Sequence, residues 1–599
     1  MAKELPKRSE VKVEDTWALE DMYASVEAWE ADMKKAEELA DLVEAKKATV
    51  TSTAKELLET LNLYFRMEEI FDLTGNYAMR ASDVDKKNAE NLARTQQYMG
   101  IVVDIQSRLA FLEPAVLTLS SETLERYMKE EPGLELYRLW FEELFRTREH
   151  TLSPELEEVI AATGEMQQTP GNIFSMFTNA DLEFPEITDE NGEQVRITSG
   201  RFVSMQCSPD RRVRKDAFMG LYSTYRKFEN TLAAMYNGQV KQLMFLAKSR
   251  KYGSTLEAAV DANNVSPKVY ENLVETIHEN MDKMHRYVRL RKKCLGVDEL
   301  HMYDVYVPMI ADADRKIPYS EAKETVLKAV APLGERYVSL IREGFENRWI
   351  DVYENQGKRG GAYSAGAYGT HPYVLLNYDH KLDDMFTLAH EMGHAMHSYF
   401  THEAQPFVYC GYKIFVAEVA STCNEVLLVE YLLANTTDKK ERAHLINHFL
   451  ESFKSTVYRQ TMFAEYEKTT NAMAEAGESL TADALRKVYY DLNCKYFGSA
   501  MVSDEEIGWE WCRIPHFYYN FYVYQYATGF SAAVAIARRI LKEGQPAVDD
   551  YMKFLSGGCS KSPVELLKIA GVDMTTKAPI QEALNLFGEL LDEMEALVE

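Results

Sequence analysis

Apolar residues recur at intervals of three and four positions along most of this chain of 599 residues. This spacing predicts amphipathic helices, each with one face turned toward a core. It is clearest in the segments 55–75, 90–112, 265–295, 320–345, 440–470 and 530–545. No internal repeat or low-complexity linker interrupts the succession. We therefore predict a mostly α fold.

The pattern changes in the segment 184–197, where residues alternate on either side of Asn191 and Gly192. Alternation around an Asn-Gly pair is typical of a β-hairpin. We place a soft domain boundary just after it, near residue 200. This gives a helical N-terminal region at 1–200 that ends in the hairpin, and a region at 201–599 that contains all the candidate catalytic residues.

Composition and charge exclude several classes of protein. With 46% hydrophobic residues the chain can bury a large core, and no apolar run approaches the roughly 20 residues of a membrane span. A net charge of −27 opposes nonspecific nucleic-acid binding, because phosphate neutralisation needs clustered Lys and Arg. The charge is compatible with attraction of basic peptides, but a solvated acidic surface explains it more simply.

The seven cysteines form an odd set without a C-x-x-C pair, which argues against a disulfide framework and a structural zinc knuckle. The first ten residues lack the apolar core of a signal peptide. We therefore expect reduced thiols and a cytoplasmic protein that does not associate with membranes.

The most informative motif is the pentad His390-Glu391-Met392-Gly393-His394. Positions i and i+4 lie on nearly the same helix face, so His390 and His394 can bind one metal ion at about 2 Å. Glu391 is rotated from that face by about a quarter turn, which suits a general base better than a ligand. Zinc lowers the pKa of its bound water to roughly 7, so a nearby carboxylate can take the proton. Gly393 weakens a helix and indicates close packing against another backbone.

An ordinary core helix with two hydrogen-bonded histidines is the alternative interpretation of this pentad. A catalytic zinc site needs a third protein ligand and one open position. Glu418 and Glu425 are seven residues apart, hence on one stripe of a second predicted helix that is otherwise mostly apolar or small. A carboxylate is costly to bury there without a cation or hydrogen-bond donors.

We therefore predict that Glu418 is the third ligand. Glu425 would orient an imidazole by accepting its other ring proton, although a solvated helix charge explains Glu425 equally well. His397 also follows the pentad closely, but a ligand from a second helix closes the tetrahedron better.

The segments 376–378, 386–397 and 418–422 resemble the thimet-oligopeptidase-like zinc peptidases (family M3), and within them the oligoendopeptidase F branch. The similarity extends to 16–23, 302–308, 557–560 and 570–573. It implies an elongated multi-helical fold with a deep substrate channel and a small β-sheet near the zinc site. It also implies one Zn²⁺ per chain and cleavage of internal bonds in short unfolded oligopeptides. Nothing in the sequence points to an obligate protein partner.

The segment 514–529 offers donors for the negative charge that develops on a scissile carbonyl, each contributing about 3 kcal/mol. It holds one His and five Tyr between positions 516 and 526, and aromatic core packing explains about half of these tyrosines equally well. The resemblance implies that His516 and one tyrosine contact the carbonyl. Tyr522 and Tyr526 are four apart and would share a helix face; we favour both without separating their roles.

A glycine-rich stretch at 357–366 precedes a predicted short strand at 371–378. Glycines beside a strand let a substrate backbone approach closely, and the resemblance implies a small sheet that binds peptide main chain. Gly360, Gly361, Ala362 and Tyr363 are the candidate substrate-binding residues. A phosphate-binding loop is disfavoured, because neither Walker spacing nor a following helix start is present.

Two hypotheses remain, a zinc metallo-oligopeptidase and a helical peptide-binding protein with a structural zinc. A structural site normally has four protein ligands and no free carboxylate beside an open position. This motif offers three ligands plus Glu391, so we prefer the enzyme.

Overall fold

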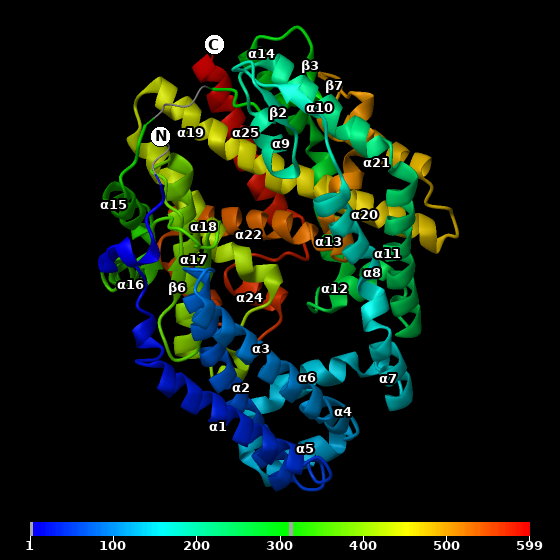
Figure 1. Ribbon diagram of the computed structural model, residues 1–599, viewed down its shortest axis with the longest axis vertical. Helices are drawn as coiled ribbons and strands as arrows, with labels where there is room; N and C mark the ends of the chain where they lie inside the picture. The colour runs from blue at the N-terminus through cyan, green and yellow to red at the C-terminus, as the bar shows by residue number, and fades with distance from the viewer. Residues whose placement is uncertain (1–3, 311–314, 599) are drawn as a thin grey trace. The chain divides into compact units, whose positions relative to one another are not determined.

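The computed structural model describes residues 4–310 and 315–598 and is predominantly α-helical, which confirms the predicted fold class (Figure 1). Its contacts group into two compact units. The first contains Met1–Glu149, Arg315–Tyr431 and Ile536–Gly571, and the second contains His150–Asp314, Leu432–Ala535 and Val572–Glu599. Each unit is made of three separate segments of the chain. This division differs from a single boundary near residue 200, which stays a prediction.

The first unit begins with six helices: α1 (Val26–Ala45), α2 (Ala54–Asp83), α3 (Ala89–Leu109), α4 (Leu112–Leu117), α5 (Ser121–Glu130) and α6 (Arg138–Arg146). Three of them start after a hydroxyl residue that accepts the N–H of the third helical residue, namely Ser25, Thr53 and Ser120. One core lies under α1, α2 and α3 and includes Trp29 and Phe71. The buried strand residue Leu375 belongs to the same core, so these helices support a strand close to the pentad.

The rest of the first unit contains α15 (Tyr319–Ala329), α16 (Glu335–Glu346), α17 (Leu382–Ala404), most of α18 (Ile414–Asn435), the end of α22 (Tyr524–Glu543), α23 (Gln545–Leu555) and α24 (Pro563–Ile569). Its sheet has the strand order β4-β6-β5. Strand β6 (Tyr373–Leu375) pairs in parallel with β4 (Ile350–Asp351) and antiparallel with β5 (Tyr363–Ala365). Helix α17 lies beside α18 and this sheet (Figure 1).

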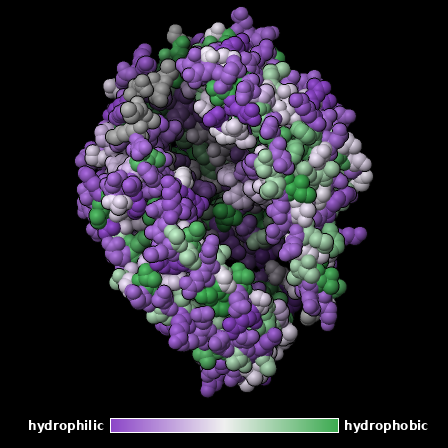
Figure 2. Space-filling model, in the orientation of Figure 1, coloured by the Kyte–Doolittle hydropathy of each residue, from purple (hydrophilic) through white to green (hydrophobic). Residues whose placement is uncertain are grey.

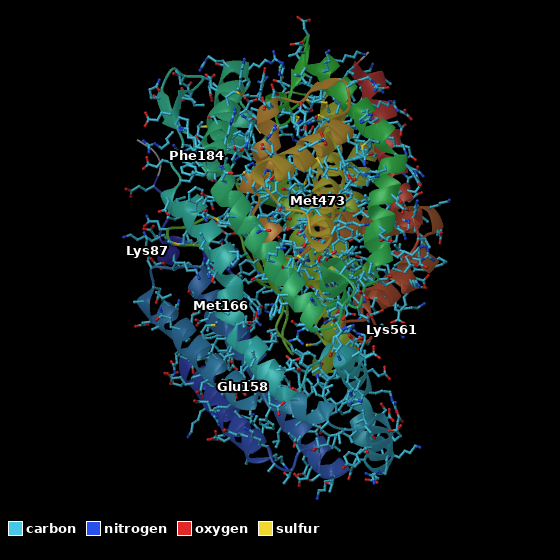
Figure 3. The ribbon with its side chains drawn as sticks, turned by 90° about the vertical axis from the view of Figure 1, so that its right-hand side faces the viewer. Lys87, Glu158, Met166, Phe184, Met473 and Lys561 are labelled. Carbon is cyan, nitrogen blue, oxygen red and sulfur yellow. The ribbon has the colours of Figure 1, made fainter. Side chains whose placement is uncertain are left out.

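The second unit contains α7 (Pro154–Ala162), α8 (Gly164–Met176), α9 (Ser199–Gln206), α10 (Arg211–Arg226), α11 (Glu229–Ser249), α12 (Thr255–Asp261), α13 (Pro267–Glu279), α14 (Met281–Leu295), α19 (Lys439–Ser452), α20 (Arg459–Glu475), α21 (Ala482–Phe497), the start of α22, and α25 (Ala578–Val598). Strands β3 (Leu300–His301) and β7 (Met501–Val502) form a short parallel pair. Met166 and Met473 mark α8 and α20 in Figure 3.

The predicted hairpin is confirmed. Strands β1 (Glu186–Thr188) and β2 (Gln194–Arg196) pair antiparallel around the Asn191-Gly192 turn. The Asp189 carboxylate accepts the N–H groups of Asn191 and Glu193, both at 2.8 Å, and so closes this turn.

Three of the predicted helical segments are interrupted. The run 265–295 divides into α13 and α14 at Asn280, whose side chain donates to the carbonyl of Thr276 and competes with the helical pattern. The run 320–345 divides at a 3-10 turn, Ala331–Leu333, that includes Pro332. The run 440–470 holds a π-helical segment, Phe453–Tyr458, between α19 and α20.

In the part of the chain that the structure describes, no helix has the length and apolar character needed to cross a membrane. Hydrophilic residues cover most of the face shown in Figure 2, with hydrophobic residues scattered among them. All seven cysteines have free thiols.

Candidate metal centre

Helices α17 and α18 cross at Gly393 of the pentad. A Cβ at this position would lie 2.5 Å from Ser421 Cα and 2.6 Å from the carbonyl oxygen of Ala420, so only glycine allows this approach. The buried side chain of Asn424 on α18 donates to the carbonyl oxygen of Ala389 on α17 at 3.0 Å. The close packing predicted from Gly393 is therefore present, and it brings the two predicted ligand helices together.

The structure brings together the three predicted metal ligands. The Nε2 atoms of His390 and His394 lie 3.3 and 3.5 Å from the same carboxylate oxygen, Glu418 Oε2. Their donor atoms all lie within 4.8 Å of one another, and the two imidazole rings are nearly perpendicular at 82°. Such an arrangement points three N and O donors at one position.

Glu425 occupies the place expected of a residue that orients an imidazole. Its Oε1 lies 3.3 Å from Nδ1 of His390, on the side of the ring opposite Glu418. Burial alone would lower the pKa of His390, but the Glu425 and Glu418 carboxylates raise it well above its usual range. The two carboxylates therefore hold this ring from both nitrogens.

Glu391 lies on the same helix turn as the ligands but is not one of the three. Its side chain is 6% exposed, and its Oε2 atom is buried without a hydrogen-bond partner among the described residues. Burial is the main reason that its pKa is raised, and the neighbouring His390 and His394 act in the opposite direction. A buried carboxylate oxygen without a partner is costly in a core but suits proton transfer.

His397, the weaker candidate for the third ligand, has a different environment. Its ring stacks on Tyr412 at 3.9 Å and is almost fully buried. Burial lowers its pKa to about 3. Glu418, and not His397, completes the group of three.

A cavity of about 410 Å³ opens beside the ligands and is lined by β5 on one side. Ala362, Tyr363 and Ser364 line it together with His390, Glu391, His394, Tyr412, Ala417 and Glu418. A small β-sheet therefore lies next to the candidate site, as expected. Because β5 is an edge strand of this sheet, its outer edge offers main-chain groups to an extended ligand.

The four candidate substrate-binding residues differ in their surroundings. Ala362 and Tyr363 line the cavity, whereas Gly360 and Gly361 precede β5 and do not. The carbonyl oxygen of Gly361 accepts a hydrogen bond from Asn377 at 2.7 Å. The Tyr363 hydroxyl donates to Asp83 at 2.6 Å, and Arg80 lies over its ring at 4.9 Å, so this side chain is held by residues outside the cavity.

These residues fit a divalent metal ion. Two imidazoles and one carboxylate are the donors of many catalytic zinc sites, in which a fourth position stays open. Here the two Nε2 atoms converge on one carboxylate oxygen, and His390 has the outer hydrogen-bond partner that metal-binding histidines almost always have.

His516, Tyr522 and Tyr526 form a cluster in the second unit. Ring centroids lie 6.5 Å apart for His516 and Tyr522, 6.0 Å for His516 and Tyr526, and 5.3 Å for the two tyrosines. The Tyr526 hydroxyl is 3.5 Å from Nε2 of His516. The prediction of a shared helix face was wrong, because α22 begins at Tyr524 and Tyr522 lies in the preceding non-helical segment.

Tyr412 and Asn424 are among the residues of the site that were not predicted. Tyr412 lines the cavity from the segment between α17 and α18, and its hydroxyl is 3.1 Å from the Ser398 hydroxyl. Asn424 joins α18 to both α17 and α16, since it also accepts from the Tyr337 hydroxyl at 3.0 Å. The hydrophobic pattern indicates that Asn424 is buried on α18, but it does not say what the side chain contacts.

The helical fold and the His-His-Glu group define a metallopeptidase. The chain belongs to peptidase family M3: the model of that family matches residues 204–586, and the model described as oligopeptidase F matches residues 116–184. It is a metal-dependent peptidase that acts on oligopeptides.

Relatives with similar sequences support this assignment over the whole chain. Oligopeptidase PepF of Bacillus subtilis is 48% identical over 597 residues, which cover 100% of this chain and 89% of that protein. An oligoendopeptidase F homolog of Lactococcus lactis is 40% identical and covers 99% of this chain and 98% of its own length. The crystal structure of oligoendopeptidase-F from Enterococcus faecium matches with a TM-score of 0.75 and 38% identity, over 95% of this chain and 98% of that one.

Proposed function

We propose that the protein is a zinc endopeptidase that holds one Zn²⁺ per chain on His390, His394 and Glu418 and uses Glu391 as its general base. The observation that carries this proposal is the convergence of both Nε2 atoms on Glu418 Oε2, at 3.3 and 3.5 Å, beside the unpartnered carboxylate oxygen of Glu391. Glu425 fixes the tautomer and the orientation of His390 by accepting its Nδ1 proton.

A bound ion would supply a positive charge to polarise the scissile carbonyl and to acidify the attacking water. Glu391 takes the proton of that water and delivers it to the leaving amide nitrogen, which is the general base and general acid role of a buried carboxylate. The position of Glu391 suits this role, because the residue is buried and its Oε2 atom has no hydrogen-bond partner among the described residues.

Substrate main chain would bind along the edge of β5. Ser364 and its neighbours pair with β6 on one side only, so the other side can add one more extended strand. Ala362 and Tyr363 would line the path of the peptide, while Gly360 and Gly361 leave room for its approach. We assign His516 with Tyr522 or Tyr526 to the stabilisation of the developing oxyanion, on the basis of the family resemblance and of their clustering.

We propose short unfolded oligopeptides as substrates, cleaved at internal bonds in the cytoplasm. Neither nucleic acid nor an obligate protein partner is needed in this account. A structural zinc in a peptide-binding protein is the weaker alternative, because such sites normally have four protein ligands and the described residues offer a group of three.

Cleavage of a quenched fluorescent peptide tests the proposal. Activity should disappear after chelation and return when zinc is restored. A chelated protein that remains folded and cleaves the peptide at the original rate would contradict it.

A further inference from the structure

A cavity of about 930 Å³ lies within the second unit, between α8, α11 and the segment 513–520. The course of α8 can be followed from Met166 in Figure 3. The cavity shares no lining residue with the metal centre.

Carboxamides are the most frequent side chains in the lining. Four come from α8 and the helical turn after it, two from α11 and one from the segment 513–520: Gln167, Gln168, Asn172, Asn179, Gln239, Gln242 and Asn520. Among the described residues, neither a carboxylate nor a lysine contributes to it, and Arg513 is the one charged lining residue. Its guanidinium donates to Glu510 at 2.7 Å and to the Tyr222 hydroxyl at 3.2 Å. The cavity therefore suits a neutral ligand that both donates and accepts hydrogen bonds.

The lining positions of α8 follow a helical period. Residues 164, 167, 168, 171, 172 and 175 are three or four apart and share one face. At these six positions the chain carries glycine, carboxamide and hydroxyl groups, whereas Phe174, which also lines the cavity, is buried and stacks on Tyr518 at 4.5 Å. Gln168, Asn172 and Ser175 are exposed, so their polar groups are accessible to a ligand.

One acceptor in the cavity has no protein partner. Gln242 donates from Nε2 to Gln239 Oε1 at 2.9 Å, and Gln239 donates in turn to Asn520 Oδ1 at 2.9 Å. At the start of this chain of amides, Gln242 Oε1 is buried and accepts no hydrogen bond from the described residues. An N–H donor from a ligand would satisfy it.

We propose that this amide-lined cavity binds the main chain of oligopeptides. Each peptide unit carries one donor and one acceptor, whatever its side chain, and each carboxamide offers the complementary pair. Recognition of this kind selects extended peptides without regard to their sequence or charge. The proposal rests on the oligopeptidase function and adds a binding site to it.

The test measures binding in full-length protein with the Glu391→Gln substitution, so that turnover does not consume the ligand. The probe is a fluorescein-labelled peptide of eight uncharged residues, followed by fluorescence anisotropy. Asn172→Leu and Gln242→Leu should each raise its dissociation constant about tenfold, since a lost hydrogen bond in a binding site has about this effect. Asn172 is exposed, so its substitution leaves the fold intact.

Thr169→Ala is the matched control, because Thr169 is an exposed residue of the same helix that does not line the cavity. It should bind the probe as tightly as the parent protein. A second probe with the same length but alternating charged side chains should lose affinity to the same extent in the Asn172→Leu protein.

Equal affinities in the folded Asn172→Leu, Gln242→Leu and Thr169→Ala proteins would overturn the proposal. So would an effect confined to the charged probe, because the site would then recognise side chains. Failure of the general-base assignment would show instead as cleavage of the probe by the Glu391→Gln protein, seen as a fall in anisotropy with time. The affinities are then compared from the anisotropy before cleavage.

Discussion

Gly393 of α17 and Ser421 of α18 are in such close contact that a Cβ on Gly393 would lie 2.5 Å from Ser421 Cα. His394 follows Gly393 directly, and Glu418 lies one helical turn before Ser421. The distance between the predicted ligands therefore depends on this crossing of two backbones.

Gly393→Ala should move the two helices apart. The added methyl group meets backbone atoms, which cannot rotate away, so we expect a loss of roughly 1–3 kcal/mol in the free energy of unfolding, together with weaker metal binding. Gly360→Ala is the control, since no atom lies within 4 Å of its Cβ position. Chemical denaturation and metal titration of both variants measure the effect; equal results for the two would contradict it.

Glu425 should affect metal affinity without being a ligand. Glu425→Leu removes the acceptor at 3.3 Å from His390 Nδ1, and loss of such an outer partner typically weakens metal binding 10- to 100-fold. Glu425→Gln keeps an acceptor oxygen and should lose less. Competition with a zinc-binding dye provides the measurement, and wild-type affinity in the leucine variant would show that Glu425 is only a surface charge.

The aromatic cluster should act on turnover. Removing one oxyanion donor usually lowers kcat by about 10²–10³, so Tyr522→Phe or Tyr526→Phe should show that loss with metal content unchanged. The variant with the larger effect identifies the tyrosine that contacts the carbonyl. If both phenylalanine variants keep the wild-type kcat, the cluster serves packing alone.

Glu467 gives the protein a pH-dependent stability. This residue of α20 is 2% exposed and accepts the N–H of Phe521 at 3.0 Å, and burial raises its pKa from 4.5 to about 8. Between these two values the unfolded chain is ionised at this site while the folded chain keeps the proton. The free energy of unfolding should therefore decrease as the pH rises from about 4.5 to 8.

Glu467→Gln keeps the acceptor oxygen but cannot ionise. Its free energy of unfolding should therefore rise relative to that of the wild type, by about 1.4 kcal/mol for each pH unit between the two pKa values of Glu467. Urea unfolding at pH 5 and pH 8 tests this, with the exposed Glu478→Gln as control. A stability difference that does not change with pH would exclude this origin.

Local spacing in the sequence was sufficient to predict the group of His390, His394 and Glu418 that the structure brings together. The positions of His390 and His394 follow from one helical turn, and the seven-residue spacing of Glu418 and Glu425 places both on one stripe of α18. Gly393 indicated the crossing, because a glycine weakens an apolar helix unless close packing compensates for it. The family resemblance added the small sheet beside the site.

What could not be predicted depends on backbone geometry or on distant contacts. The left-handed conformations of Asn520 and Phe521, with φ of 52° and 56°, delay the start of α22. A phenylalanine rarely adopts this conformation, so periodicity continued the helix through Tyr522. Tyr412 contacts Ser398, and Glu467 accepts the N–H of Phe521. These partners are 14 and 54 residues away in the sequence, and no spacing rule predicts contacts at such separations.

The most direct test of the central claim measures metal content and turnover in the same sample of Glu391→Gln protein. The account predicts about one zinc ion per chain, because Glu391 is not a ligand, and a kcat reduced by about 10²–10⁴ through loss of the general base. A zinc-loaded Glu391→Gln protein with wild-type turnover would contradict the account.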